Sequence, residues 1–117
     1  KEFTESTGFQ PAVILVDAFD FARAVKKDLE IWKSLSDSYG AETWFSATLH
    51  RHALEFDQRG IPAPVNSFAD DCAVIVMLEP KKNHIDLKLL KDHDSKDLEP
   101  LKLKLDPRTL LISNHRV

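Results

Sequence analysis

The sequence predicts an α/β fold, in which parallel strands are followed by an antiparallel meander in a mixed sheet of the three-layer type. An uninterrupted apolar run within Pro11–Asp17 has the pattern of a buried parallel strand. A helical pattern and a second strand pattern follow it, and this order predicts a right-handed crossover between parallel neighbours. In the last third of the chain, apolar and polar residues alternate as they do in strands with one solvated face.

The composition indicates an ordinary globular chain. Its 117 residues predict a single domain, 1–117, with residues 1–10 as a flexible polar arm. The net charge of −3 gives no nucleic-acid signal, so nucleic acid is an unsupported partner, and no apolar run is long enough for a membrane span. The lone Cys72 excludes an internal disulfide framework and suits a reducing compartment, which predicts a cytoplasmic protein. Because the first residue is Lys1 rather than methionine, we expect a fragment or a processed product.

The first strand and helix are predicted from apolar spacing and capping residues. Since Pro11–Asp17 shows no alternation, we expect this strand to be buried on both faces. Asp20 is expected to cap a helix over about Phe21–Tyr39, and Gly40 is expected to end it. The residues expected on the buried face of this helix are Val25, Leu29, Trp32 and Leu35.

The remaining elements are shorter. A second strand is predicted at about Glu42–Leu49, and Gly60–Asn66, which contains two prolines, is predicted to be an exposed loop. An apolar strand is expected at Cys72–Leu78, followed by a turn at Pro80–Asn83. Further strands are predicted at His84–Lys91, Leu101–Leu105 and Thr109–Ile112.

Asp17 is the first candidate for chemistry. It follows the apolar strand, at the sheet edge where open α/β proteins bind ligands. P-loop nucleotide hydrolases place a carboxylate there to hold the magnesium ion of the bound nucleotide, which is the Walker B arrangement. The alternative is that Asp17 only ends a strand or begins a helix.

The order of the segments resembles the C-terminal half of a RecA-like ATPase core of the KaiC and DnaB type. The segments that carry the resemblance are Val13–Asp17, Phe45–Arg51, Phe68–Leu78 and Leu89–His93. In those families a Walker B strand, a helix and a strand ending in a polar sensor residue come first. A loop, an apolar strand preceded by Ala-Asp, and antiparallel strands with a basic finger then follow. The resemblance implies a truncated RecA-like core that binds ATP with Mg²⁺.

The resemblance also implies roles for particular residues. It makes Asp17 the magnesium ligand, Thr48 or His50 the phosphate sensor, and Lys91 with His93 the finger that reaches a neighbouring site. The sensor is usually glutamine and the finger is usually Lys-x-Arg, so this chain departs from the family at both positions. It also contains no Gly-x-x-x-x-Gly-Lys-Ser/Thr sequence to cradle phosphates. We therefore expect a partial nucleotide-binding domain that does not hydrolyse ATP alone.

The sequence leaves other interpretations open. The chain is either half of an ATPase or a degenerate relative, and in the second case a non-catalytic protein-interaction module. Asp17, His50 and His52 are also candidate zinc or iron ligands of a small metal-dependent enzyme. Asp70 and Asp71 are more readily explained as turn caps than as an acid–base pair. The expected partner is a second copy or a missing N-terminal half, because removal of a P-loop half would uncover an apolar face and strand edges.

Overall fold

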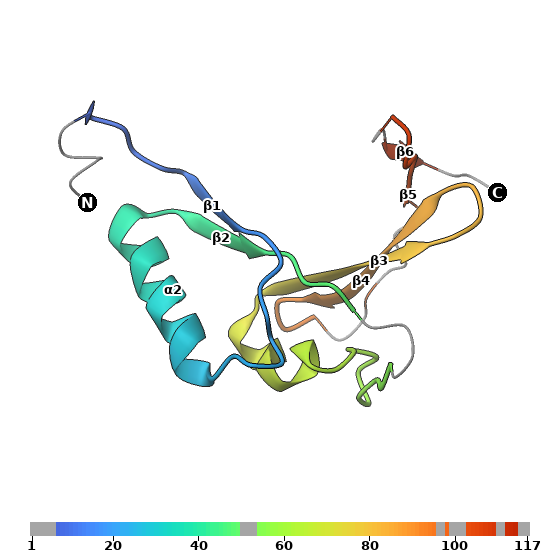
Figure 1. The fold of residues 1–117 in the computed structure, drawn as a ribbon, viewed down its shortest axis with the longest axis horizontal. Helices are drawn as coiled ribbons and strands as arrows, with labels where there is room; N and C mark the ends of the chain where they lie inside the picture. Colours follow the sequence, from blue (N-terminus) through green and yellow to red (C-terminus); the bar gives the residue numbers. More distant parts are fainter. Residues whose placement is uncertain (1–6, 50–53, 96–97, 99–102, 110–111, 115–117) are drawn as a thin grey trace. The chain divides into compact units, whose positions relative to one another are not determined.

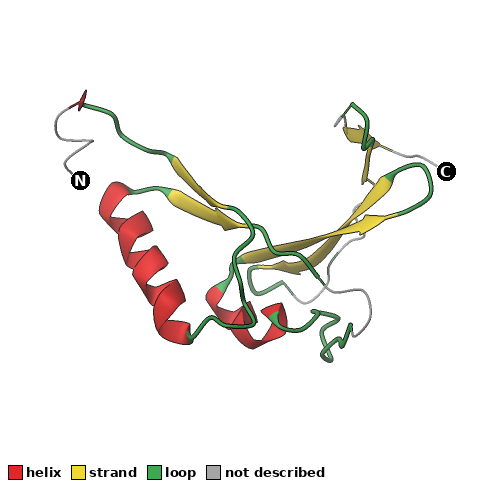
Figure 2. Ribbon diagram, viewed as in Figure 1, coloured by secondary structure: helices red, strands yellow, loops and turns green. Residues whose placement is uncertain are grey.

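The computed structural model describes residues 7–49, 54–95, 98, 103–109 and 112–114. Contacts divide the chain into unit 1, Lys1–Leu54, and unit 2, Glu55–Val117. The described parts are a small mixed α/β arrangement with parallel strands first and antiparallel strands after them, so the coarse fold class is confirmed (Figures 1 and 2). The single domain at 1–117 stays a prediction.

The described strands form two sheets rather than the one mixed sheet that we expected. In unit 1, β1 (Val13–Val16) pairs in parallel with β2 (Glu42–Phe45). In unit 2, the antiparallel sheet has the order β3-β4-β5-β6. The difference arises because β3 takes its partner from the next strand along the chain, through a short hairpin, and not from a strand of unit 1.

The parallel pairing in unit 1 leaves one face of its sheet uncovered. Leu15 is 77% exposed, so the prediction that this strand is buried on both faces is wrong for the described chain. On the other face, Trp32 packs edge-to-face on Phe45 and Ser36 hydrogen-bonds Thr43, which places α2 (Lys26–Tyr39) against that side. The helix covers one face only, and β2 is shorter than the predicted strand, which extended to Leu49.

The helix of unit 1 begins later than the sequence predicts. Asp20 caps a preceding turn, where its Oδ1 accepts a hydrogen bond from the Ala22 N–H at 3.1 Å. The helix itself starts after Val25, whose N–H donates to Asp28 Oδ2 at 2.9 Å. Asp20 therefore caps a turn that separates the strand from α2, and the prediction that it caps the helix is wrong.

The buried stripe of α2 is narrower than predicted. Leu29 and Ser36 are buried, whereas Val25 and Leu35 are exposed, which corrects their assignment to the buried face. The stripe is narrow because α2 packs mainly against β2. Gly40 ends the helix in the left-handed conformation, with φ of 62°, as predicted.

Unit 2 consists of a short helix and an antiparallel meander. Its elements are η2 (Val65–Asp71), β3 (Val74–Pro80), β4 (Ile85–Asp92), β5 (Leu103–Leu105) and β6 (Ile112–Asn114). The predicted turn between the first strands is confirmed, because the Lys81 N–H donates to the His84 carbonyl at 2.8 Å. The predicted meander is confirmed, with the strand bounds shifted by a few residues.

The segment before η2 is not the exposed loop that Gly60–Asn66 predicted. Ile61 is fully buried and Pro62 is buried beside it. Asp57 makes this burial possible, because its Oδ1 accepts a hydrogen bond from the Ile61 N–H at 2.9 Å. This hydrogen bond is also the main reason why the pKa of Asp57 is lowered.

A β-bulge in the hairpin changes which face Lys91 occupies. Val76 pairs with Leu89, but Ile75 pairs with Lys91, so Leu90 has no partner in the register. Strict alternation would put Lys91 on the face of Leu89. The extra residue moves it to the face of Ile75.

The same face carries a charged cluster around Glu79. The Lys81 amino group donates to Glu79 Oε1 at 2.6 Å, and the Lys88 amino group pairs with Oε2. The hydrogen bond from Lys81, followed by that from Lys88, lowers the pKa of Glu79 from 4.5 to about 2.

We predict that Glu79→Gln makes the free energy of unfolding depend less on pH in the acid range. Because the folded pKa lies below the unfolded one, the carboxylate stabilises the fold above about pH 4.5, and this contribution is lost as the pH falls towards about 2. Chemical denaturation at a series of pH values should show the largest loss for the variant at neutral pH and convergence with the wild type near pH 2. Glu55→Gln, at an exposed position of unit 2, is the control. Parallel profiles for the wild type and Glu79→Gln would contradict the prediction.

Candidate functional site

Asp17 lies where the sequence predicts, directly after β1 and at the carboxyl end of the parallel pair. Val16 pairs with Phe45, so Asp17 and Ser46 are the next residues on neighbouring strands. Both side chains are exposed to solvent at this edge. The edge is therefore open to a ligand, as expected for an α/β sheet.

Ser46 holds the carboxylate of Asp17. Its hydroxyl donates to Asp17 Oδ1 at 2.5 Å and accepts a hydrogen bond from the Ala18 N–H at 2.8 Å. Because the backbone N–H occupies one lone pair of the oxygen, the hydroxyl proton is directed to the carboxylate. No described residue donates to Oδ2 of Asp17, which leaves that oxygen for a ligand.

The backbone after β1 is also bound to Ser46. The Phe19 N–H donates to the Ser46 carbonyl at 2.8 Å, and the Ser46 N–H donates to the Val16 carbonyl at 3.0 Å. Between them Ala18 has φ of 54°, a conformation that costs an L residue roughly 1–2 kcal/mol. Strain of this kind persists where surrounding contacts determine the backbone, as the contacts of Ser46 do here.

An aromatic cluster packs the segment after Asp17 against β2. The Phe19 ring lies 4.8 Å from Phe21 and 5.0 Å from Phe45, and Trp32 lies 6.2 Å from Phe45, all in edge-to-face geometry. Each such pair contributes about 0.5–1.5 kcal/mol beyond the area that it buries. The loop after Asp17 therefore folds back onto β2 and α2.

The sequence-based candidates beyond β2 are only partly placed. Thr48 is exposed and follows the end of the strand, so it lies on the segment that leaves the site. His50 and His52 lie outside the described residues. Within the part of the chain that the structure describes, no group of three histidine, cysteine or acidic side chains could hold a metal ion. The metal-enzyme interpretation depends on His50 and His52, so it stays a hypothesis.

The sequence did not predict Ser46 as a residue of the candidate site. It assigned the sensor to Thr48 or His50 because the second strand was expected to run to Leu49. In the sequence, Ser46 is the first polar residue after Trp44-Phe45, but its register with Asp17 follows only from the strand pairing in the structure. Because β2 ends at Phe45, Ser46 directly follows the strand, and its side chain reaches the carboxylate.

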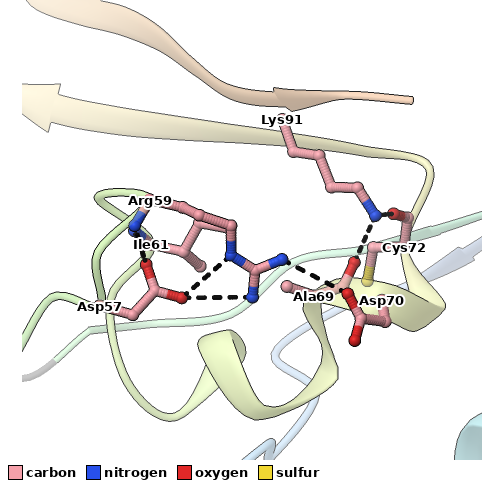
Figure 3. A network of polar contacts seen from close by, with 7 residues as sticks. All are labelled: Asp57, Arg59, Ile61, Ala69, Asp70, Cys72 and Lys91. Carbon is pink, nitrogen blue, oxygen red and sulfur yellow. Dashed lines mark hydrogen bonds and ion pairs between the residues drawn. The ribbon is translucent and has the colours of Figure 1, made fainter. Parts of the chain in front are cut away.

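Lys91 forms a structural contact within unit 2 (Figure 3). Its amino group donates to the carbonyls of Ala69 and Cys72, both at 2.6 Å. These carbonyls belong to the C-terminal end of η2, where a cation is favourable. The side chain is half-buried, and its role as a finger towards a neighbouring site stays a prediction.

A second polar network joins the loop before η2 to the C-terminal end of this helix. Arg59 pairs with Asp57 Oδ2 at 3.3 Å and with Asp70 Oδ1 at 3.4 Å (Figure 3). Asp70 and Asp71 are the last residues of η2, and the pairing of Asp70 with Arg59 supports a structural role for it. Burial raises the pKa of the Cys72 thiol, so this cysteine is not poised as a nucleophile.

His93 lies just after β4 in the left-handed conformation, with φ of 52°. Its backbone N–H donates to the Ala73 carbonyl at 2.6 Å, and its ring Nδ1 lies 2.8 Å from Asp92 Oδ1. The side chain is exposed. Its role in a finger towards a neighbouring site stays a prediction.

The side chain of Asp17 is suited to bind magnesium, whereas the backbone beside it is not suited to bind phosphate. Carboxylate oxygens, such as those of Asp17, are among the ligands that Mg²⁺ prefers. A phosphate cradle needs several free backbone N–H groups, whereas those of Ala18 and Phe19 are bound to Ser46. The described edge can therefore supply a carboxylate oxygen to a divalent cation.

Comparisons with known proteins do not extend this picture. No protein-family model matches the chain, and neither the curated proteins nor the solved structures include a significant match. No described helix is both long and apolar enough to cross a membrane.

We predict that Lys91→Met destabilises the fold. Methionine keeps most of the side-chain length but removes two charge-assisted hydrogen bonds to carbonyls, which should lower the free energy of unfolding by about 2 kcal/mol. Chemical denaturation measures the loss. Lys82→Met at the exposed hairpin turn is the control, and it should change stability by less than about 0.5 kcal/mol. Equal effects of the two substitutions would show that Lys91 contributes no structural contact.

Proposed function

We propose that the chain is a partial nucleotide-binding domain of the RecA-like ATPase type, built on a truncated three-layer core. Asp17 is its Walker B-type carboxylate, on the magnesium side of a bound ATP. The observation that carries this proposal is the position of Asp17, exposed at the carboxyl end of β1 and hydrogen-bonded to Ser46, which directly follows the parallel neighbour β2.

Within this proposal, the residues of the chain orient a ligand and do not complete the chemistry. Bound Mg²⁺ would neutralise charge on the phosphates, and it is usually held by one or two carboxylates together with phosphate and water oxygens. Asp17 would supply one such oxygen, and Oδ2 is the one without a described donor. Hydrolysis also needs phosphate-binding N–H groups and a lysine on the terminal phosphates, and the sequence has no P-loop motif to supply them.

The other candidates keep subsidiary roles in the proposal. Thr48 and His50 follow Ser46 along the chain and are the sensor candidates. His93 is exposed and is available to reach a neighbouring subunit. Lys91 is the weakest candidate, because its amino group already binds two carbonyls within unit 2.

The proposal predicts weak, Asp17-dependent binding without hydrolysis. With Mn²⁺–ATP as a paramagnetic probe, the amide NMR signals next to Asp17 and Ser46 should broaden, because Mn²⁺ replaces Mg²⁺ and broadening falls steeply with distance. Asp17→Asn should abolish this broadening, since the amide lacks the negative charge. In a protein that also contains a P-loop half, Asp17→Asn should remove most of the ATPase activity and leave the fold intact.

Asp37→Asn is the matched control, because this carboxylate is exposed on α2 in the same unit. It should leave the broadening unchanged. Phosphate release from ATP and Mg²⁺ should not exceed the background for the 117-residue chain. Robust magnesium-dependent hydrolysis by this chain that survives Asp17→Asn would overturn the proposal.

The uncovered sheet face favours a second candidate function, a non-catalytic interaction module. Leu15 on β1 and Trp44 on β2 are partners in the register, and they are 77% and 54% exposed. Val13 is exposed on the same face, and no described strand pairs with the outer edge of β1. Parallel sheets are normally covered on both faces, so this face is expected to associate with a second copy of the chain.

We predict concentration-dependent self-association through this face. Sedimentation velocity should show larger species as the protein concentration rises, and Leu15→Ser should reduce them because it removes exposed apolar area from β1. Leu78→Ser, at an exposed position of β3 in unit 2, is the matched control and should leave the association unchanged. A wild-type chain that stays monomeric at high concentration would contradict the prediction.

A further inference from the structure

The side chain of Ser46 contacts both Asp17 and the backbone that follows it. Its hydroxyl lies 2.5 Å from Asp17 Oδ1 and 2.8 Å from the Ala18 nitrogen, so one oxygen joins the carboxylate to the turn. The carbonyl and N–H of the same residue bind Phe19 and Val16. Ser46 thus donates two hydrogen bonds and accepts two, and together they determine where Asp17 lies.

We propose that Ser46 is the positioning residue of this site, which directs Oδ2 of Asp17 towards a divalent cation. The inference rests on the proposed function. The hydroxyl is a directed donor, because its oxygen already accepts the Ala18 N–H, so it fixes Oδ1 on the β2 side. With Oδ1 held, rotation of the carboxylate is restricted, and the residue itself is exposed to solvent.

Chemistry at metal sites supports such a role for a residue that does not itself bind the metal. Partners that hydrogen-bond a ligating carboxylate orient it, and their removal typically lowers metal affinity by about 10–100-fold. Ser46 satisfies this description, since it contacts the oxygen of Asp17 opposite to the one left free. Thr48 and His50 follow the end of β2, and the structure shows no contact between Thr48 and Asp17.

The test measures Mn²⁺ binding with the metal alone and with Mn²⁺–ATP, by the broadening of amide signals near Asp17. Ser46→Ala should weaken the apparent affinity about tenfold. Ser46→Thr keeps the hydroxyl and should retain most of the affinity. Ser34→Ala, at an exposed position of α2, is the control and should have no effect. The remaining amide shifts must match the wild type, which separates positioning from loss of structure.

A thermal-denaturation cycle tests the contact without any metal. Ser46→Ala should lower the transition temperature in the wild-type background and lower it less when Asp17→Ala is already present, because their shared hydrogen bond is then gone. If Ser46→Ala does not fold, Ser46→Cys keeps the side-chain volume with a weaker donor and should give an intermediate loss of Mn²⁺ affinity.

The outcomes separate the two proposals. If Asp17→Asn abolishes the broadening and Ser46→Ala leaves it unchanged, the nucleotide-binding proposal stands and the positioning role of Ser46 is wrong. If Asp17→Asn also leaves the broadening unchanged, the proposed function fails and the inference fails with it. Loss of affinity in Ser46→Ala with retention in Ser46→Thr, together with coupling in the thermal cycle, supports the inference.

Discussion

The parallel register between β1 and β2 is the constraint on which the candidate site depends. Because Val16 pairs with Phe45, the residues that follow both strands emerge side by side, and a carboxylate meets a hydroxyl. The same register brings Phe45 under the loop after Asp17, where Phe19 packs on its ring. A shift of this register by one residue would send Ser46 to the opposite face of the sheet and separate it from Asp17. The chemistry proposed for unit 1 is therefore a consequence of strand pairing.

In unit 2, one hydrogen bond allows a short loop to be buried, and a bulge places one lysine against the end of η2. Asp57 satisfies the N–H of Ile61, and this allows an apolar side chain to be fully buried just before η2. The end of η2 then presents the carbonyls of Ala69 and Cys72 to Lys91. The lysine reaches them because the bulge in the hairpin changes the face from which it projects. Lys91, which resembles part of the basic finger of RecA-like ATPases, thus forms a structural contact within unit 2.

The uncovered face of unit 1 connects the fold to both proposed functions. A parallel pair of strands with a helix on one side is an incomplete α/β layer, because parallel sheets are normally covered on both faces. Exposure of Leu15 and Trp44 on the other side gives the chain an apolar surface beside the edge that holds Asp17. A covering partner would therefore lie next to the candidate site. Both proposed functions therefore place a binding partner at the same small sheet.

The sequence by itself determined the elements with strong local signals. The apolar run before Asp17, the glycine that ends α2 and the alternating strands of unit 2 each depend on neighbouring residues, so pattern alone predicted them. Only the tertiary structure decided that Ser46 and not Thr48 contacts Asp17, because this follows from where β2 ends and how it is paired. It also decided the burial of Ile61 and the face of Lys91, since a hydrogen bond from Ile61 to Asp57 and a bulge at Leu90 leave no trace in the hydrophobic pattern.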